Sequence, residues 1–139
     1  MDERIVKFLK KMHLASVCTI DDEGQPYAFS AFYAFDEVNF CLLLASCDES
    51  SHVKFLKNSK LVAGTIALDT KIVGKIEGVQ FQGAMSEASE SEREIYFKRF
   101  FYAKAMDPKI WSISLEKVKF TSNTLGFGKK IKWERGDKI

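Results

Sequence analysis

Residues 72–88 read IVGKIEGVQFQGAMSEA, and this stretch decides the fold. Its length and composition predict one long β-strand, which is interrupted by the glycines Gly74, Gly78 and Gly83. A glycine inside a strand marks a bulge, a bend or the close approach of another group. A long strand with glycines at such intervals is a typical way to round the corner of a β-barrel. The stretch therefore indicates a strongly curved sheet.

Shorter strands are expected on both sides of this segment, because apolar runs alternate there with turn residues. They are Leu14–Ile20, Tyr27–Phe35, Val38–Ala45, Leu61–Leu68 and Ile110–Phe120. Tight turns separate the first three strands, so these are expected to form an antiparallel meander.

Three helices complete the expected elements. The first, near residues 2–12, carries a single apolar stripe with helical spacing. A short second helix ends near Asn58, and the third follows a capping box of Ser89 and Glu92 and runs to about Lys104. Strands and helices show no regular β-α-β alternation. This favours an antiparallel barrel with helical decoration over a doubly wound parallel sheet.

The composition sets bounds on domain number and compartment. A chain of 139 residues is one domain by length. Its net charge of +2 is too small to argue for nucleic acid, although residues 117–139 hold seven Lys or Arg against two acidic residues. Three cysteines without C-x-x-C spacing indicate neither a disulfide framework nor a zinc site. With no secretory signal and no apolar run long enough to span a membrane, cytoplasmic localisation is expected.

Hydrolytic and metal chemistry find little support in the sequence. With only two histidines, His13 and His52, a catalytic triad or a three-histidine metal site is nearly excluded. Two histidines and a carboxylate would suffice for an iron site, but nothing in the sequence places them together. No phosphate-binding loop or dinucleotide motif is present. The sequence therefore predicts no metal site and leaves any catalytic residue unidentified.

Residues 46–54, SCDESSHVK, place small hydroxyl residues at the start of a helix directly after a strand. The N–H groups at a helix N-terminus suit a phosphate. The alternative is an ordinary N-cap, with Ser50 or Ser51 capping the helix and His52 on the surface.

Residues 78–84, GVQFQGA, present Gln80 and Gln82 on one strand face and Val79 and Phe81 on the other. Two amides on one face can hydrogen-bond the edge of a heterocycle. The alternative is a solvated outer face.

The closing run 120–133, FTSNTLGFGKKIKW, follows a strand and ends in positive charge. Its glycines, lysines and hydrogen-bonding side chains suit an anionic ligand. Interleaved basic and aromatic residues are also compatible with single-stranded nucleic acid. A plain strand on the rim of the barrel is the preferred alternative to nucleic-acid binding.

Taken together, these segments resemble the FMN-binding split-barrel superfamily of pyridoxamine 5′-phosphate oxidase-like proteins, and within it a branch of short bacterial proteins, the YhbP-like family. The resemblance covers nearly the whole chain, and its last segment is the most specific. It is carried by Ala31–Tyr33 with Phe35–Asp36, by Ala63–Thr65, by Gly78–Gly83 and by Phe120–Lys130.

The resemblance implies a mainly β (α+β) fold, a six- to seven-stranded antiparallel split β-barrel with about three peripheral helices, as a single FMN-binding domain over residues 1–139. It also implies a homodimer with one flavin in each of two clefts at the subunit interface. FMN is the expected cofactor, with a deazaflavin or haem as alternatives. Neither a membrane nor nucleic acid is expected as a partner.

The resemblance also implies a set of cofactor-binding residues. Ser50, Ser51 and His52 match the phosphate-binding run, but the Arg-Lys pair of the family is absent. His52 with Lys54 or Lys57, or tail lysines of a partner subunit, would take its place. The full set is Ser30, Phe32, Tyr33, Ser46, Ser50, Ser51, His52, Gln80, Asn123, Lys129 and Lys130.

The expected function is that of a flavin-dependent oxidoreductase, with NAD(P)H or another small molecule as reaction partner. Pyridoxamine-phosphate oxidase activity is not expected, because the residues that hold that substrate lie in chain that this sequence lacks. The alternatives are a non-catalytic flavin- or haem-binding module, with His52 or His13 as the haem ligand, and a nucleic-acid-binding barrel.

Overall fold

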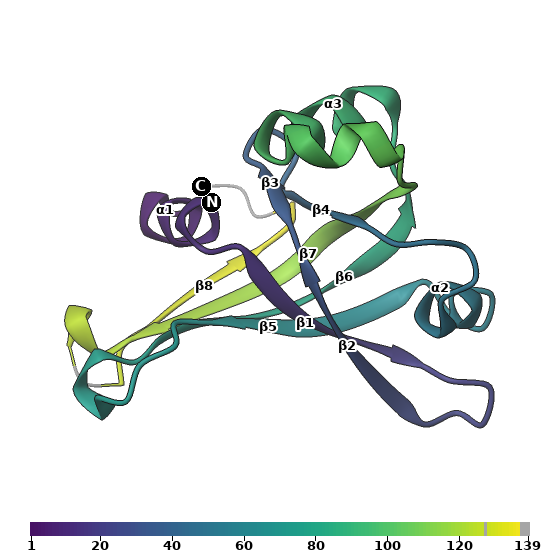
Figure 1. The fold of residues 1–139 in the computed structure, drawn as a ribbon. Coiled ribbons are helices and arrows are strands. Elements are labelled where there is room, and N and C mark those ends of the chain that lie inside the picture. Colours follow the sequence, from purple (N-terminus) through teal and green to yellow (C-terminus); the bar gives the residue numbers. More distant parts are fainter. Residues whose placement is uncertain (127, 137–139) are drawn as a thin grey trace.

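The computed structural model describes residues 1–126 and 128–136 (Figure 1). Its strands are β1 Leu14–Ile20, β2 Pro26–Phe32, β3 Ala34–Asp36, β4 Cys41–Ala45, β5 Leu61–Ala67, β6 Glu77–Glu87, β7 Ile110–Ser122 and β8 Lys130–Glu134. Its α-helices are α1 Glu3–Lys11, α2 Ser51–Phe55 and α3 Glu90–Arg99, and short 3-10 turns are η1 Val73–Lys75, η2 Phe101–Met106 and η3 Asn123–Leu125.

All strands join one antiparallel sheet in the order β2-β1-β5-β6-β7-β4-β3, with β8 paired to β7. The long strands β6 and β7 curl the sheet into a half-barrel, and the helices lie at its periphery (Figure 1). The predicted fold class, a mainly β split barrel with three peripheral α-helices, is therefore confirmed. The described residues form eight strands, because the predicted second strand divides and the closing run adds β8.

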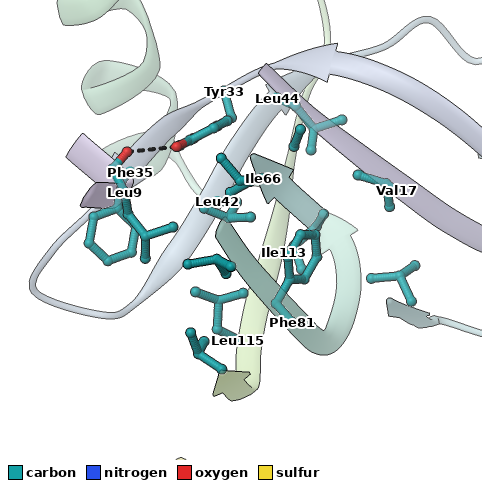
Figure 2. Close-up of a cluster of buried hydrophobic side chains, with 14 of the residues drawn as sticks. Leu9, Val17, Tyr33, Phe35, Leu42, Leu44, Ile66, Phe81, Ile113 and Leu115 are labelled. Atoms are coloured by element: carbon teal, nitrogen blue, oxygen red, sulfur yellow. Dashed lines mark hydrogen bonds between the residues drawn. The ribbon is translucent and has the colours of Figure 1, made fainter. Parts of the chain in front are cut away.

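The predicted strand 27–35 divides into β2 and β3, while both antiparallel pairings of the predicted meander are present. β2 pairs with β1 at one edge of the sheet, whereas β3 pairs with β4 at the other edge. The chain crosses between them at Tyr33, whose side chain is fully buried and whose hydroxyl donates a hydrogen bond to the Leu9 carbonyl oxygen of α1 (2.7 Å; Figure 2).

The predicted strand 72–88 begins only at Glu77, because η1 takes up residues 73–75 and holds Gly74 outside the sheet. Gly83 has the expected role. The register of β6 against β7 shifts between Gln82 and Gly83, and a Cβ at Gly83 would overlap the Ser114 carbonyl oxygen. This bulge bends β6 over its neighbour.

Two further predicted elements differ from the structure at one end, the strand from Val38 at its start and the third helix at its finish. The strand expected from Val38 begins at Cys41, because the buried carboxylate of Asp36 accepts hydrogen bonds from the backbone N–H groups of Val38 and Asn39 and closes a turn. Helix α3 starts with the predicted capping box at Ser89 but ends at Arg99, after which η2 follows.

The core fills the concave, inner face of the sheet. Side chains from β1, β4, β5, β6 and β7 meet there, and Leu9 of α1 closes one end (Figure 2). A second cluster packs α3 against β3 and β4. Because the inner face is filled by protein, the outer face of the sheet is the surface that remains for a ligand.

Candidate functional site

A row of polar side chains crosses the outer face of the sheet. The strand registers place one residue of each of six neighbouring strands directly opposite the next. In order from β2 through β1, β5, β6 and β7 to β8, this polar row consists of Ser30, Ser16, Thr65, Gln80, Lys119 and Lys132. Their neighbours along each strand are mostly core residues, so strand alternation directs the row outward. The row passes from hydroxyls through an amide to two lysines.

A second row runs beside the first. It consists of Ala28, Cys18, Ala63, Gln82, Lys117 and Glu134. On β2, β1 and β5 its members are small, and on β6 it places a second carboxamide, Gln82, on the same face as Gln80. The predicted sharing of one face by the two glutamines is confirmed.

The parts of the two rows on β5, β6, β7 and β8, together with Cys18 of β1, line a groove of about 650 Å³. Its floor is smooth, because Cys18 and Ala63 carry little side-chain volume. Gly64, between Ala63 and Thr65, faces the core instead, where a Cβ would overlap both the Phe81 ring and the Ser16 carbonyl oxygen. The volume lies within the range of small-molecule binding sites.

A separate polar cluster lies where β4 ends and α2 begins. The Ser46 hydroxyl lies 2.7 Å and the Ser50 hydroxyl 3.3 Å from Nε2 of His52. The His52 ring stacks on Phe29, with ring centroids 3.7 Å apart. Burial lowers the pKa of His52 below its usual value, which favours a neutral ring. The His52 ring is therefore held by contacts with Ser46, Ser50 and Phe29, and it does not offer a free positive charge to a phosphate.

The hydroxyls of this cluster are also largely engaged. Ser50 holds the N-cap position of α2, but its side chain donates to the Cys47 carbonyl oxygen (2.7 Å) instead of capping the helix. Ser51 is exposed. The Trp111 ring nitrogen donates to the Ser46 carbonyl oxygen (3.1 Å), which holds the end of β4 against β7.

The structure places the other predicted cofactor residues in different surroundings. Ser30 and Phe32 lie on the outer face of β2, and Gln80 lies in the groove. Tyr33 is part of the core, so its predicted place along the flavin ring is corrected: no part of its side chain reaches the surface.

Asn123 is engaged in shaping the loop between β7 and β8. Its side-chain nitrogen donates to the Val73 carbonyl oxygen (3.0 Å), and its side-chain oxygen accepts from the Gly128 N–H (2.9 Å). Phe127 of the closing run, and residues 137–139 of the basic tail, lie outside the described residues.

Lys129 and Lys130 are distant from the Ser46–Ser50–His52 cluster within one chain. Lys130 pairs with Thr121 at one end of β7, whereas the end of β4 pairs with Ile110 at the other end. Eleven strand steps of about 3.3 Å separate these ends by up to about 36 Å. Figure 1 shows α2 and the start of β8 at opposite ends of the sheet.

Sequence reasoning missed several residues that line the groove, namely Cys18, Thr65, Lys117, Lys119 and Lys132. A signal for two of them was present, because Lys117 and Lys119 alternate with Val118 and Phe120. Their position beside Gln80 and Lys132 depends on strand pairing, which the alternation does not reveal.

The described residues contain neither a membrane-spanning helix nor a cluster of metal ligands. No helix there has the length and apolar character needed to cross a membrane. No three His, Cys, Asp or Glu side chains of residues 1–126 and 128–136 gather in a way that could hold a metal ion.

The half-barrel architecture places the chain in the class of split β-barrel proteins. A heme binding protein from Mycobacterium smegmatis matches with a TM-score of 0.73 and 16% identity, over 88% of this chain and 53% of that one. An FAD-binding protein from Mesorhizobium loti matches with a TM-score of 0.69 and 14% identity, over 85% of this chain and 91% of that one. At these identities the likeness concerns the fold alone.

The chain belongs to the UPF0306 family of YhbP proteins. YhbP of Salmonella paratyphi A is 38% identical over 135 residues, which cover 94% of this chain and 91% of the relative. No protein-family model matches the chain. The resemblance to the YhbP branch is thereby confirmed, while binding of FMN stays a proposal.

Proposed function

We propose that this protein binds FMN in the groove on the outer face of its sheet and uses it in redox chemistry on a small molecule. The observation that carries the proposal is the groove itself, about 650 Å³ with a floor of small side chains beside two carboxamides. A flavin ring is flat, and one of its edges carries hydrogen-bond donors and acceptors. Gln80 and Gln82 each offer both kinds of group to such an edge.

The chain would bind and orient the flavin, which when bound supplies the electron-transfer chemistry. Gln80, Gln82 and Thr65 would hydrogen-bond the polar edge of the ring. Cys18 and Ala63 would lie beneath its flat face. No described side chain in the groove has the surroundings of a general acid or base, so the proposal assigns the chain positioning rather than proton transfer.

A homodimer is part of the proposal, because the predicted phosphate contacts cannot meet within one chain. Ser50 and Ser51 lie at one end of the sheet and Lys129 and Lys130 at the other. The outer face also exposes large apolar side chains near the groove: Leu14 is 48%, Phe32 56% and Leu61 70% exposed. Covering this surface with a second copy would bury this apolar area.

The test is an FMN titration of the purified protein, followed by the flavin absorbance bands. Saturable binding is expected, and Gln80→Ala and Gln82→Ala should each weaken FMN affinity about tenfold, because each removes hydrogen bonds in a partly dry site. Gln25→Ala, in the exposed turn before β2, is the matched control. Absence of saturable FMN binding by the wild-type protein would refute the proposal. If FMN binds, NADH- and NADPH-linked reduction assays on the loaded protein identify the electron donor.

Haem is the second candidate, and the surroundings of His13 favour it. The His13 side chain is exposed and stacks on Phe32 of the outer face, with ring centroids 5.7 Å apart. An exposed histidine beside an apolar surface can serve as an axial ligand. His52 suits this role less well, because Nε2 already contacts two hydroxyls. In haem-loaded protein, His13→Ala should shift or abolish the Soret band, whereas His52→Ala should leave it in place. The reverse result would exclude His13 as the ligand.

A further inference from the structure

The lysine end of the polar row holds an unbalanced pair of charges. Lys119 of β7 and Lys132 of β8 are directly opposite one another in the strand register and line the same groove. Like charges in this arrangement destabilise a sheet. Among residues 1–126 and 128–136, no carboxylate lies within ion-pair distance of either ammonium group.

The neighbouring cross-strand pair shows how the same two strands balance charge. Lys117 is opposite Glu134, and the two groups lie 3.8 Å apart. The Lys119–Lys132 pair lacks the acidic partner that Lys117 has in Glu134. An anion from solution placed between the two ammonium groups would supply the missing negative charge.

The surroundings of the pair define the rest of the ligand. Gln80 is opposite Lys119 on the side away from Lys132, and Thr65 follows Gln80. Strands are spaced by about 4.8 Å, so the row from Lys132 to Thr65 spans about 14 Å. A ligand lying along it would place its anionic group at the lysines and a polar ring or chain over the amide and hydroxyl.

We propose that Lys119 and Lys132 together form a binding site for the phosphate group of a phosphorylated small molecule lying along the polar row. The site stands on the register and the charges alone, so it holds whether or not the groove takes a flavin. The phosphate has two candidate sources, FMN itself and a separate phosphorylated substrate, and the same residues would recognise either.

The first experiment measures pyrophosphate binding to the cofactor-free protein by calorimetry and by its effect on Tm. Wild-type protein should bind pyrophosphate with a rise in Tm, and Lys119→Gln and Lys132→Gln should each weaken binding about tenfold or more, because each removes a charge-assisted contact. Lys117→Gln removes the same charge from the same face, but its ammonium group is already paired, so a smaller loss is expected. Lys104→Gln in η2 controls for net charge. Equal losses in all four variants would show a diffuse charge effect and overturn the site.

Lys132→Glu guards against loss of binding through misfolding. This change places a carboxylate opposite Lys119, as Glu134 lies opposite Lys117. The cofactor-free variant should therefore have a Tm at or above that of the wild type. It should nevertheless fail to bind pyrophosphate. Retained pyrophosphate binding in this variant would overturn the proposal.

A second experiment separates the two sources of phosphate. If the site serves the cofactor, Lys119→Gln and Lys132→Gln should weaken FMN but not riboflavin, and FMN should displace pyrophosphate. If it serves a separate substrate, FMN-loaded protein should still bind pyrophosphate. Failure of all flavin binding would refute the proposed function while leaving the pyrophosphate result to stand. Undetectable pyrophosphate binding by the wild-type protein overturns the site itself.

Discussion

Replacing Tyr33 by Phe tests whether this residue belongs to the core or to a cofactor site. The change removes one hydroxyl and keeps the buried ring. That hydroxyl donates to the Leu9 carbonyl oxygen at 2.7 Å, in the last turn of α1. The last carbonyl groups of a helix have no partner within the helix. The variant therefore leaves a buried carbonyl oxygen without its hydrogen bond.

The expected cost follows from that loss. An unsatisfied buried polar group costs about 1–3 kcal/mol. In a chain of this size, a loss of that order lowers Tm by roughly 3–10 °C. Urea unfolding at pH 7 would measure the free energy of unfolding, and the slope of the transition should not change.

Two comparisons make the Tyr33 result decisive. Tyr102→Phe is the matched control, because the Tyr102 side chain is 70% exposed, and its stability should stay within about 0.5 kcal/mol of the wild type. The affinity of Tyr33→Phe for FMN should equal that of the wild type. A variant as stable as the wild type, but with weakened FMN binding, would refute the assignment of Tyr33 to the core.

Three further predictions concern the bulge at Gly83, the half-buried His52 and the cap of α3. Gly83→Ala should destabilise the protein by about 1–3 kcal/mol in urea unfolding, because a Cβ there overlaps the Ser114 carbonyl oxygen. Gly74→Ala is the control, because a Cβ at Gly74 meets open space and the free energy of unfolding should change little. Burial lowers the pKa of His52, so as the pH falls the unfolded chain takes up the His52 proton before the folded chain does. The free energy of unfolding of the wild type should therefore decrease relative to that of His52→Gln as the pH drops below about 6.5. Parallel pH profiles of the two proteins would contradict this. Ser89→Ala removes half of the capping box of α3 and should cost about 1 kcal/mol, measured by thermal unfolding.

Local pattern was sufficient for much of the fold. The strand Leu14–Ile20 has the predicted ends, since alternation and flanking turn residues both act over a few neighbouring positions. The capping box at Ser89 and the bulge at Gly83 were also readable, because each depends on one residue type at one position. The predicted strand 27–35 differs from the structure where distant contacts act: it divides at Tyr33, whose side chain is buried and whose hydroxyl donates to the carbonyl oxygen of Leu9, a residue 24 positions away.

The candidate site shows the same division. By itself, the sequence determined that Gln80 and Gln82 share a strand face, that Ser50 and His52 begin a helix, and that positive charge gathers near the end of the chain. Only the tertiary structure decided that Lys119 and Lys132 face one another beside Gln80, and that Lys129 and Lys130 lie far from His52. The physical reason is that side-chain direction is a local property of a strand, whereas register is set by pairing between strands that are distant in the sequence.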